Sequence, residues 1–267
     1  MILMVPFIFG GVLATAGAAN ATPSFGGPPF GPPGLRALIC SNGSISSGNY
    51  ASITVRGTCS PATNAVIRVV GNLDVAPGAT LDAQDVPSTI TVGQNVTAFS
   101  GSLLELGCLP GPNPNLGYPC TVDPSGSSNI TVNGNIVATD AFFVALRGIT
   151  VRGSVVVIGG GVHTTDGSNN WPIKLDTIGG NVIVHGANPD WVGVIANTIR
   201  GNVILTNITI DTGPTPPAEN INVGSNTIGQ NLICFGLVPA VNGGFGTPNV
   251  IGGKAIGQCA NLQLATP

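Results

Sequence analysis

The segment ITVNGNIVA (130–138) sets the pattern on which the fold depends, because variants of it recur through most of the chain. In each variant a polar residue, usually Thr, and an apolar residue precede a turn, and an apolar-x-apolar strand follows. The turn is Gly-Asn or a close relative of it in ITVRGT (53–58), IRVVGN (67–72), ITVGQN (90–95), ITVNGN (130–135), ITVRGS (149–154), DTIGGN (176–181), NTIRGN (197–202) and NTIGQN (226–231). A short unit that recurs in this way predicts a stacked repeat architecture.

The geometry of one repeat explains why it must stack. Successive side chains of a strand point to opposite faces, so the apolar residue before the turn faces inward and the Thr faces outward. Gly tolerates positive φ and Asn visits the left-handed region at low cost, so the pair bends the chain. One repeat cannot bury its apolar edge, whereas a stack can. Since parallel crossovers are right-handed in about 98% of cases, we expect an all-β, single-stranded, right-handed parallel β-helix (β-solenoid).

The alignment also predicts two ladders of stacked side chains. The turn asparagines should lie above one another at one corner and bond to each other and to the turn backbone, as Asn72, Asn95, Asn135, Asn181, Asn202 and Asn231. An outward file should contain Thr54, Thr91, Thr131, Thr150, Thr177, Thr198 and Thr227. A single threonine column favours a ladder that supports strand stacking over an ice-binding surface.

Composition supports the same fold class and excludes some partners. The 267 residues include 40 Gly and 22 Pro, and only 7% are charged. Glu, Lys, Arg and Met, which favour helices, are sparse, whereas β-branched residues and turn formers are abundant. The net charge is −3 and the eight Lys and Arg residues are scattered. Nucleic acids and anionic membrane surfaces require clustered basic residues, so neither is expected as a partner.

The chain divides into three segments. Residues 1–21, MILMVPFIFGGVLATAGAANA, resemble a secretory signal with an apolar stretch and an A-x-A-like cleavage site, although no Lys or Arg precedes that stretch. Residues 22–37 form a Pro/Gly-rich tether with little capacity to pack. Residues 38–267 form the β-helix domain, in which no segment is apolar enough to span a membrane. We therefore expect a secreted protein, extracellular or on the cell surface.

Six cysteines fit an exported chain. Nearest-neighbour pairing gives Cys40–Cys59, Cys108–Cys120 and Cys234–Cys259, although fifteen connectivities are formally possible. Local pairing is favoured because two pairs lie at the ends of the repeat region, where they would close the open edges of the stack, and the third brackets a Pro-rich loop. No CxxC motif occurs and neither His lies near a Cys pair, so no metal site and no cofactor are expected.

The segment NTIGQNLICFGLVPAVNGGFGTPNVIGGKAIGQC (226–259) resembles the ending of a group of secreted bacterial β-helix proteins to which no activity is assigned. These proteins carry V-x-G-N-V rungs and close with N-L-x-C, a Pro-containing loop, P-N-x-V-G-G and G-Q-C. ITVRGTC (53–59) and GNLDVAPGATLDA (71–83) are similar to the same group. The resemblance implies a secreted β-helix and supports a Cys234–Cys259 disulfide. More distantly, the rungs are similar to pectate-lyase-like β-helices and to bactofilin-type polymers, but the catalytic residue sets of the pectate lyases and related glycosidases are missing.

One region is a candidate binding surface. His163 and His185, and likewise Trp171 and Trp191, are each about one rung apart, so stacking would bring like residues together on one face. Two nearly coplanar tryptophans could stack on sugar rings. The simpler interpretation, which we favour, is that each Trp covers a rung corner and each His is a solvated loop residue.

Acidic residues near this region are candidates for catalysis. Asp166 and Asp190 lie in the polar loops HTTDGSNN (163–170) and HGANPD (185–190), and Asp176 lies between them. Glycoside hydrolysis needs two carboxylates about 5–10 Å apart, but chance neighbours are common, so we interpret all three as solvated loop acids and predict no catalytic residue. Asp82 and Asp85 of LDAQD are interpreted as a turn.

These observations favour an exported, non-enzymatic solenoid with a structural or adhesive role. The alternative is a carbohydrate-active β-helix protein, a lyase or glycoside hydrolase if it is an enzyme. It would bind or cleave a polysaccharide or cell-surface glycan with His163, Asp166, Trp171, His185, Asp190 and Trp191.

Overall fold

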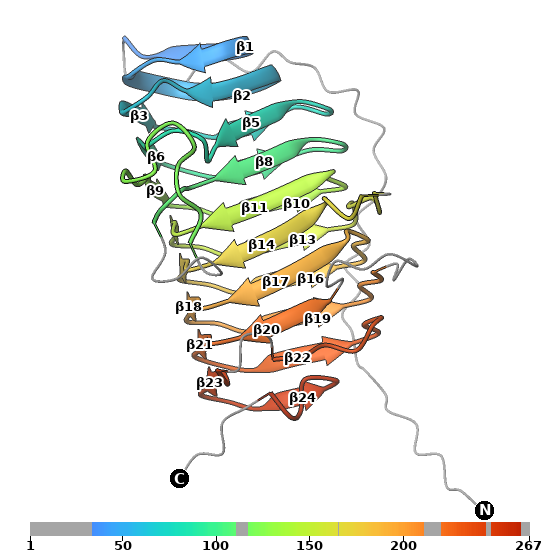
Figure 1. The fold of residues 1–267 in the computed structure, drawn as a ribbon. Coiled ribbons are helices and arrows are strands. Elements are labelled where there is room, and N and C mark those ends of the chain that lie inside the picture. The colour runs from blue at the N-terminus through green and yellow to red at the C-terminus, as the bar shows by residue number, and fades with distance from the viewer. Residues whose placement is uncertain (1–33, 111–116, 165, 211–219, 244–246, 263–267) are drawn as a thin grey trace, which may run out of the picture. The chain divides into compact units, whose positions relative to one another are not determined.

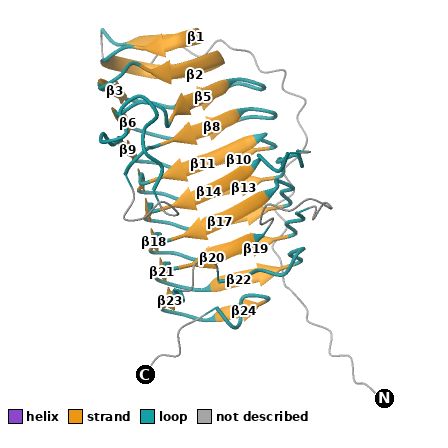
Figure 2. Ribbon diagram, in the orientation of Figure 1, coloured by secondary structure: helices purple, strands orange, loops and turns teal. Residues whose placement is uncertain are grey.

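The computed structural model describes residues 34–110, 117–164, 166–210, 220–243 and 247–262, which belong to one compact unit, Gly31–Pro267. The described residues form strands, turns and loops without a helix, so none of them offers a helix that could span a membrane (Figure 2). The strands join in one 24-stranded parallel sheet that coils upon itself, which confirms the predicted solenoid. The predicted signal (1–21) and residues 22–33 of the predicted tether lie outside the described residues.

The short strands from β3 onward form three columns, stacked in chain order in Figure 1, and each turn adds one strand to each column except the last two turns, which add none to the third. The first column contains β3 (Ala65–Val69), β6 (Ser88–Val92), β9 (Asn129–Val132), β12 (Thr150–Val151), β15 (Thr177–Ile178), β18 (Thr198–Ile199), β21 (Thr227–Ile228) and β23 (Val250–Ile251). The second contains β4 (Leu73–Val75), β7 (Val96–Ala98), β10 (Ile136–Thr139), β13 (Val155–Ile158), β16 (Val182–His185), β19 (Val203–Thr206), β22 (Leu232–Phe235) and β24 (Ala255–Gly257). The third contains β5 (Thr80–Ala83), β8 (Leu103–Leu106), β11 (Phe143–Arg147), β14 (Asn170–Lys174), β17 (Trp191–Ile195) and β20 (Ile221–Gly224).

The N-terminal end of the stack is built differently. β1 (Arg36–Ile45) pairs along β2 (Gly48–Pro61), and β2 is long enough to pair with β3, β4 and β5 in turn. One continuous strand therefore covers the first rung of all three columns. This arrangement leaves β1, rather than three short strands, at the edge of the stack.

The outward threonine file is confirmed from Thr91 onward. Parallel pairing places six threonines in register on consecutive strands: Thr91, Thr131, Thr150, Thr177, Thr198 and Thr227. The prediction is wrong for Thr54, which pairs with Asp74 in the second column. The reason is the length of β2, which carries residues 53–55 past the first column. Arg68 occupies the file position opposite Thr91 instead.

The predicted asparagine ladder is confirmed along its whole length. The side-chain oxygen of each member accepts a hydrogen bond from the backbone amide one rung further on. The amide of Asn95 donates to Oδ1 of Asn72 (3.1 Å), and the amide of Asn202 donates to Oδ1 of Asn181 (2.8 Å). Ser154 takes the place of an asparagine between Asn135 and Asn181 and continues the chain of bonds. The ladder ends at the amide of Lys254, which donates to Asn231.

A second ladder, which the sequence alignment missed, lies inside the solenoid. Asp176, Asn197, Asn226 and Asn249 immediately precede first-column strands and are buried. The backbone amide of each of the first three donates to Oδ1 of the next, over 2.9 to 3.1 Å. The asparagine Nδ2 groups donate to the carbonyls of Ile173, Val194 and Val223, so these buried amides are satisfied.

The three disulfides have the predicted nearest-neighbour pairing, Cys40–Cys59, Cys108–Cys120 and Cys234–Cys259. The first joins β1 to β2, and the last joins β22 to the segment that follows β24. Both ends of the stack are therefore closed by covalent bonds, as expected. The middle disulfide closes a loop between β8 and β9, whose base is an antiparallel bridge of Leu109 with Tyr118.

Candidate functional site

The two tryptophans do not stack, contrary to the expectation from their spacing. Within the pair β14–β17, Trp191 lies opposite Asn170, and Trp171 lies opposite Val192. A shift of one residue turns a side chain to the other face of a sheet. Trp171 consequently points into the core, with 2% of its surface exposed, and its Nε1 donates to Oδ1 of Asn169. Trp191 remains half-buried on the outer face.

The two histidines are also separate. His185 ends β16, where it pairs with Ile158 and Thr206, and its Nδ1 lies 2.8 Å from Oγ1 of Thr206. His163 lies in the loop before β14, and its Nδ1 lies 2.6 Å from Oδ1 of Asp190. His185 is exposed as expected, but His163 is held against a buried carboxylate.

Asp190 is the centre of a buried polar network and is not the solvated acid we expected. Its carboxylate accepts hydrogen bonds from the backbone amide and hydroxyl of Thr164 and from the amide of Asn169. Burial alone would raise the pKa of Asp190, but these bonds and His163 outweigh burial and hold the pKa below its ordinary value. The network fixes the loop before β14.

The other two acids of this region differ from each other. Asp166 is exposed, as expected, and accepts a bond from the amide of Ser168. Asp176 is fully buried at the start of the inner ladder, and burial raises its pKa to about 8. Its Oδ1 accepts from the amide of Ile149, whereas its Oδ2 has no hydrogen-bond partner among the described residues. The expectation of a solvated loop acid is therefore wrong for Asp176 and Asp190.

A different cluster lies on the outer face of the third column, around Trp191. The indole lies over Gly193, since a Cβ at Gly193 would fall 1.8 Å from Cη2 of the ring. Only glycine leaves room for the ring to lie on the sheet. Nε1 of Trp191 donates to Oδ1 of Asn222 over 2.6 Å, and Nζ of Lys174 lies 4.8 Å from the ring centroid. The aromatic ring is thus fixed flat, with the ammonium of Lys174 over it and the amide of Asn222 at its Nε1.

Acidic residues occupy the same face nearer the N-terminus. Asp82 of β5 lies directly opposite Glu105 of β8. Burial and the neighbouring charge of Asp82 raise the pKa of Glu105 to about 7, against the opposing effect of Arg147. Burial also raises the pKa of Asp82, with Asp85 contributing. Asp82 Oδ1 accepts from the amides of Gln84 and Asp85, so the predicted turn is present.

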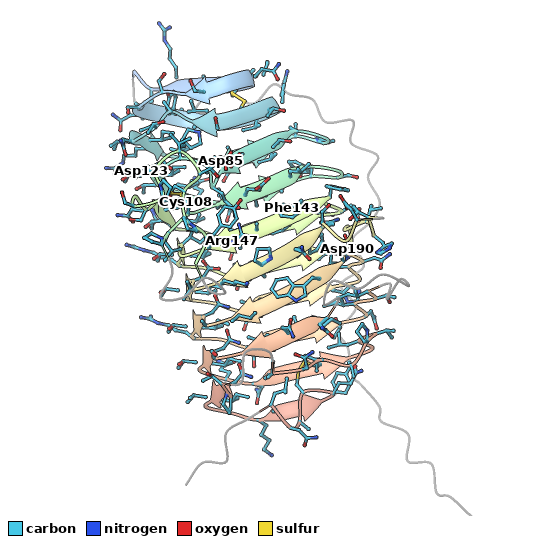
Figure 3. The ribbon with its side chains drawn as sticks, viewed as in Figure 1. Asp85, Cys108, Asp123, Phe143, Arg147 and Asp190 are labelled. Carbon is cyan, nitrogen blue, oxygen red and sulfur yellow. A yellow bond between two sulfur atoms is a disulfide. The ribbon has the colours of Figure 1, made fainter. Side chains whose placement is uncertain are left out.

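Two cations lie between the acids and the tryptophan. Arg147 of β11 donates to Oε1 of the buried Gln84, and its guanidinium lies 3.9 Å from the ring centroid of Tyr118 in the Cys108–Cys120 loop. Arg147 lies opposite Lys174 of β14. Burial, and then the charge of Arg147, lower the pKa of Lys174 to about 8. In Figure 3, Arg147 and Asp85 lie beside the Cys108–Cys120 loop. Asp190 lies at the opposite end of the third-column strands.

Together these residues form what we call the charged–aromatic face: Asp82, Glu105, Arg147, Lys174, Trp191 and Asn222. Sequence reasoning found only Trp191 among them. A signal did exist, because Glu105, Arg147 and Lys174 interrupt strand-like runs in LLELG, FVALRG and WPIK, in a chain with few charges. Among the described residues no group of three His, Cys, Asp or Glu side chains is arranged to hold a metal ion.

No family model matches the chain, and no match was found among curated proteins or among solved structures. The resemblance to secreted bacterial β-helix proteins therefore stays a prediction.

Proposed function

We propose that this protein is an exported, non-enzymatic adhesive solenoid that binds an extended polysaccharide along the charged–aromatic face. The observation that carries the proposal is the indole of Trp191, which is held flat on the sheet over Gly193. Sugars present an apolar C–H face to aromatic rings, and a ring fixed in advance loses little entropy on binding. The disulfides support export, because such bonds persist in oxidising compartments.

The surroundings of Trp191 suit a sugar polymer. Asn222 fixes the indole, because its Oδ1 accepts from Nε1 of Trp191 and its Nδ2 donates to Oδ1 of Asn242. Nζ of Lys174 lies 4.8 Å from the ring centroid, so this side chain must move off the ring face before a sugar can stack there, and it would then be a donor beside the sugar. Six strands from β5 to β20, spaced by about 4.8 Å, give the face a length of roughly 24 Å. A chain of several sugar units fits this length better than a monosaccharide does.

The test is a glycan array followed by titration of the best ligands into the purified protein. Replacing Trp191 by Ala should weaken binding by about tenfold or more, because it removes the stacking platform. Phe235→Ala, which removes another exposed aromatic ring in the second column, is the matched control and should leave affinity unchanged. No binding to any glycan, or equal losses in the two variants, would overturn the proposal.

Glycan cleavage is a second candidate, and the pair Asp82 and Glu105 favours it. The two carboxylates come from directly paired positions, and a pKa of about 7 suits Glu105 to a general acid. A reducing-sugar assay on each bound glycan tests this candidate. Turnover that Glu105→Gln abolishes while binding persists would establish catalysis, and bound glycans that stay intact would exclude it.

A further inference from the structure

A hollow of about 330 Å³ lies on the outer face of the first column, away from the strands of the charged–aromatic face. It is lined by Thr150, Thr177 and Val151 and by the turn residues Arg152, Gly179 and Arg200. Parallel register sets Thr150 beside Thr177, and the same register brings Arg152, Gly179 and Arg200 to equivalent places on consecutive rungs.

Gly179 keeps the hollow open. A Cβ at this position would fall 2.2 Å from the carbonyl oxygen of Arg152, so no other residue fits the backbone there. The rung between the two arginines consequently has no side chain at the position equivalent to Arg152 and Arg200. Arg152 and Arg200 are both exposed and flank this gap, about two strand spacings or roughly 10 Å apart at the backbone.

The charge around the hollow has one sign. The first-column strands and the turns after them, all described, contain four of the eight Lys and Arg residues and no Asp or Glu: Arg68, Arg152, Arg200 and Lys254. The one ion pair within the described residues joins His163 and Asp190, so neither Arg152 nor Arg200 is neutralised by a described carboxylate.

We infer that this hollow binds the anionic group, carboxylate or sulfate, of an acidic polysaccharide. The planar guanidinium donors of Arg152 and Arg200 match the paired oxygens of such groups. Arg152 and Arg200 line the hollow on the rungs before and after Gly179, and Thr150 and Thr177 line it with side chains that carry hydroxyl groups. The inference is independent of the proposed function, because a separate column of strands carries it.

An acidic polysaccharide fits this strip better than a nucleic acid. Proteins that track single-stranded nucleic acid combine positive charge with aromatic rings on which bases stack. The first-column strands and their turns contain no aromatic residue. Four cations spread over eight rungs are also too sparse to follow a phosphate backbone.

The test compares polygalacturonate, dextran sulfate, neutral dextran and oligo(dT) as ligands of the intact protein in direct titrations at low and moderate salt. Both acidic polymers should bind, neutral dextran should not, and affinity should fall as salt screens the charges. The double variant Arg152→Gln, Arg200→Gln should lose about tenfold in affinity and each single variant about threefold. Tighter binding to oligo(dT) than to either acidic polysaccharide would overturn the assignment.

Arg56→Gln is the matched control, because Arg56 is exposed and lies outside this strip. It makes the same change in net charge as each single variant and should leave affinity unchanged. Binding that survives the double variant, or an equal loss in Arg56→Gln, would overturn the inference. Trp191→Ala should not change binding of the acidic polymers at this hollow. Loss of anion binding in the arginine variants and loss of glycan binding in Trp191→Ala therefore test the two proposals separately.

Discussion

The backbone amide of Asp176 donates a 2.9 Å hydrogen bond to Oδ1 of Asn197, which makes an acid the first member of a ladder otherwise built from asparagines. In the asparagine members, Nδ2 donates to the carbonyl of a third-column residue such as Ile173. In Asp176 the atom Oδ2 replaces the Nδ2 of the asparagines, and this Oδ2 has no hydrogen-bond partner among the described residues. The register of β11 with β14 identifies the carbonyl of Leu146 as the acceptor that an amide would reach.

We therefore predict that Asp176→Asn stabilises the protein by about 1–3 kcal/mol above the folded pKa, where the ionised carboxylate cannot donate to this carbonyl and an amide can. The gain should grow with pH. The pKa of Asp176 is raised to about 8 in the folded protein, so the folded state holds a proton that the unfolded chain has lost. Stability contributed by this proton declines as pH rises from the unfolded pKa through about 8.

Urea unfolding of both proteins at about pH 5 and pH 9 checks this prediction. The wild type should lose more stability than Asp176→Asn between the two conditions. A variant that is less stable than the wild type at both pH values would contradict it.

Asn135→Ala should destabilise the protein by about 1 kcal/mol, because Oδ1 of Asn135 accepts the amide of Ser154 in the outer ladder. Asn133→Ala is a control from the same turn. Asn133 is exposed and no bond of its side chain is described, so its replacement should change stability little. Thermal or urea unfolding of the two variants provides the comparison, and equal losses would show that the ladder bond contributes nothing.

Asp190→Asn should loosen the loop before β14 and cost about 2–4 kcal/mol, since it disturbs a buried carboxylate with several donors. The folded pKa of Asp190 is lowered, so its contribution is present above the unfolded pKa and is lost as pH falls through the folded value. The variant should therefore lack this part of the acid sensitivity. Limited proteolysis and unfolding at several pH values measure both effects, and the exposed Asp166→Asn should resemble the wild type.

Glu105 should titrate near pH 7 in the folded protein, which carboxyl carbon NMR can follow directly. Asp82→Asn should lower the pKa of Glu105, because it removes a neighbouring negative charge. Arg147→Gln should raise it, because it removes a positive one. Shifts in the opposite directions, or titration at the ordinary glutamate value in the wild type, would contradict the described electrostatics.

The repeat could be predicted from the sequence because each repeat contains its own turn motif. Gly-Asn turns identify the corner between the first and second columns, so the Asn ladder and most of the Thr file could be aligned without a structure. Thr54 was misplaced because β2 runs through three columns without a turn that the motif recognises. The disulfides could also be predicted, because each joins cysteines that are neighbours in the sequence.

The charged–aromatic face was harder to predict because no recurring turn motif identifies the strands of the third column. Its strands follow loops of unequal length, so Trp171 and Trp191 are one rung apart in the sequence but one residue out of register in the sheet. Asp82, Glu105, Arg147 and Lys174 come from successive rungs at irregular intervals. Only the strand pairing reveals that they share a face.

The register between neighbouring turns has a consequence for how this protein can change in length. Thr177 lies beside Thr198, and Val182 lies beside Val203, so residues 177–197 form one complete, interchangeable turn. Duplication of this turn in the gene would present matching strands, ladder amides and core side chains at both junctions. The protein can therefore be lengthened by one whole turn at a time without disturbing the register on either side.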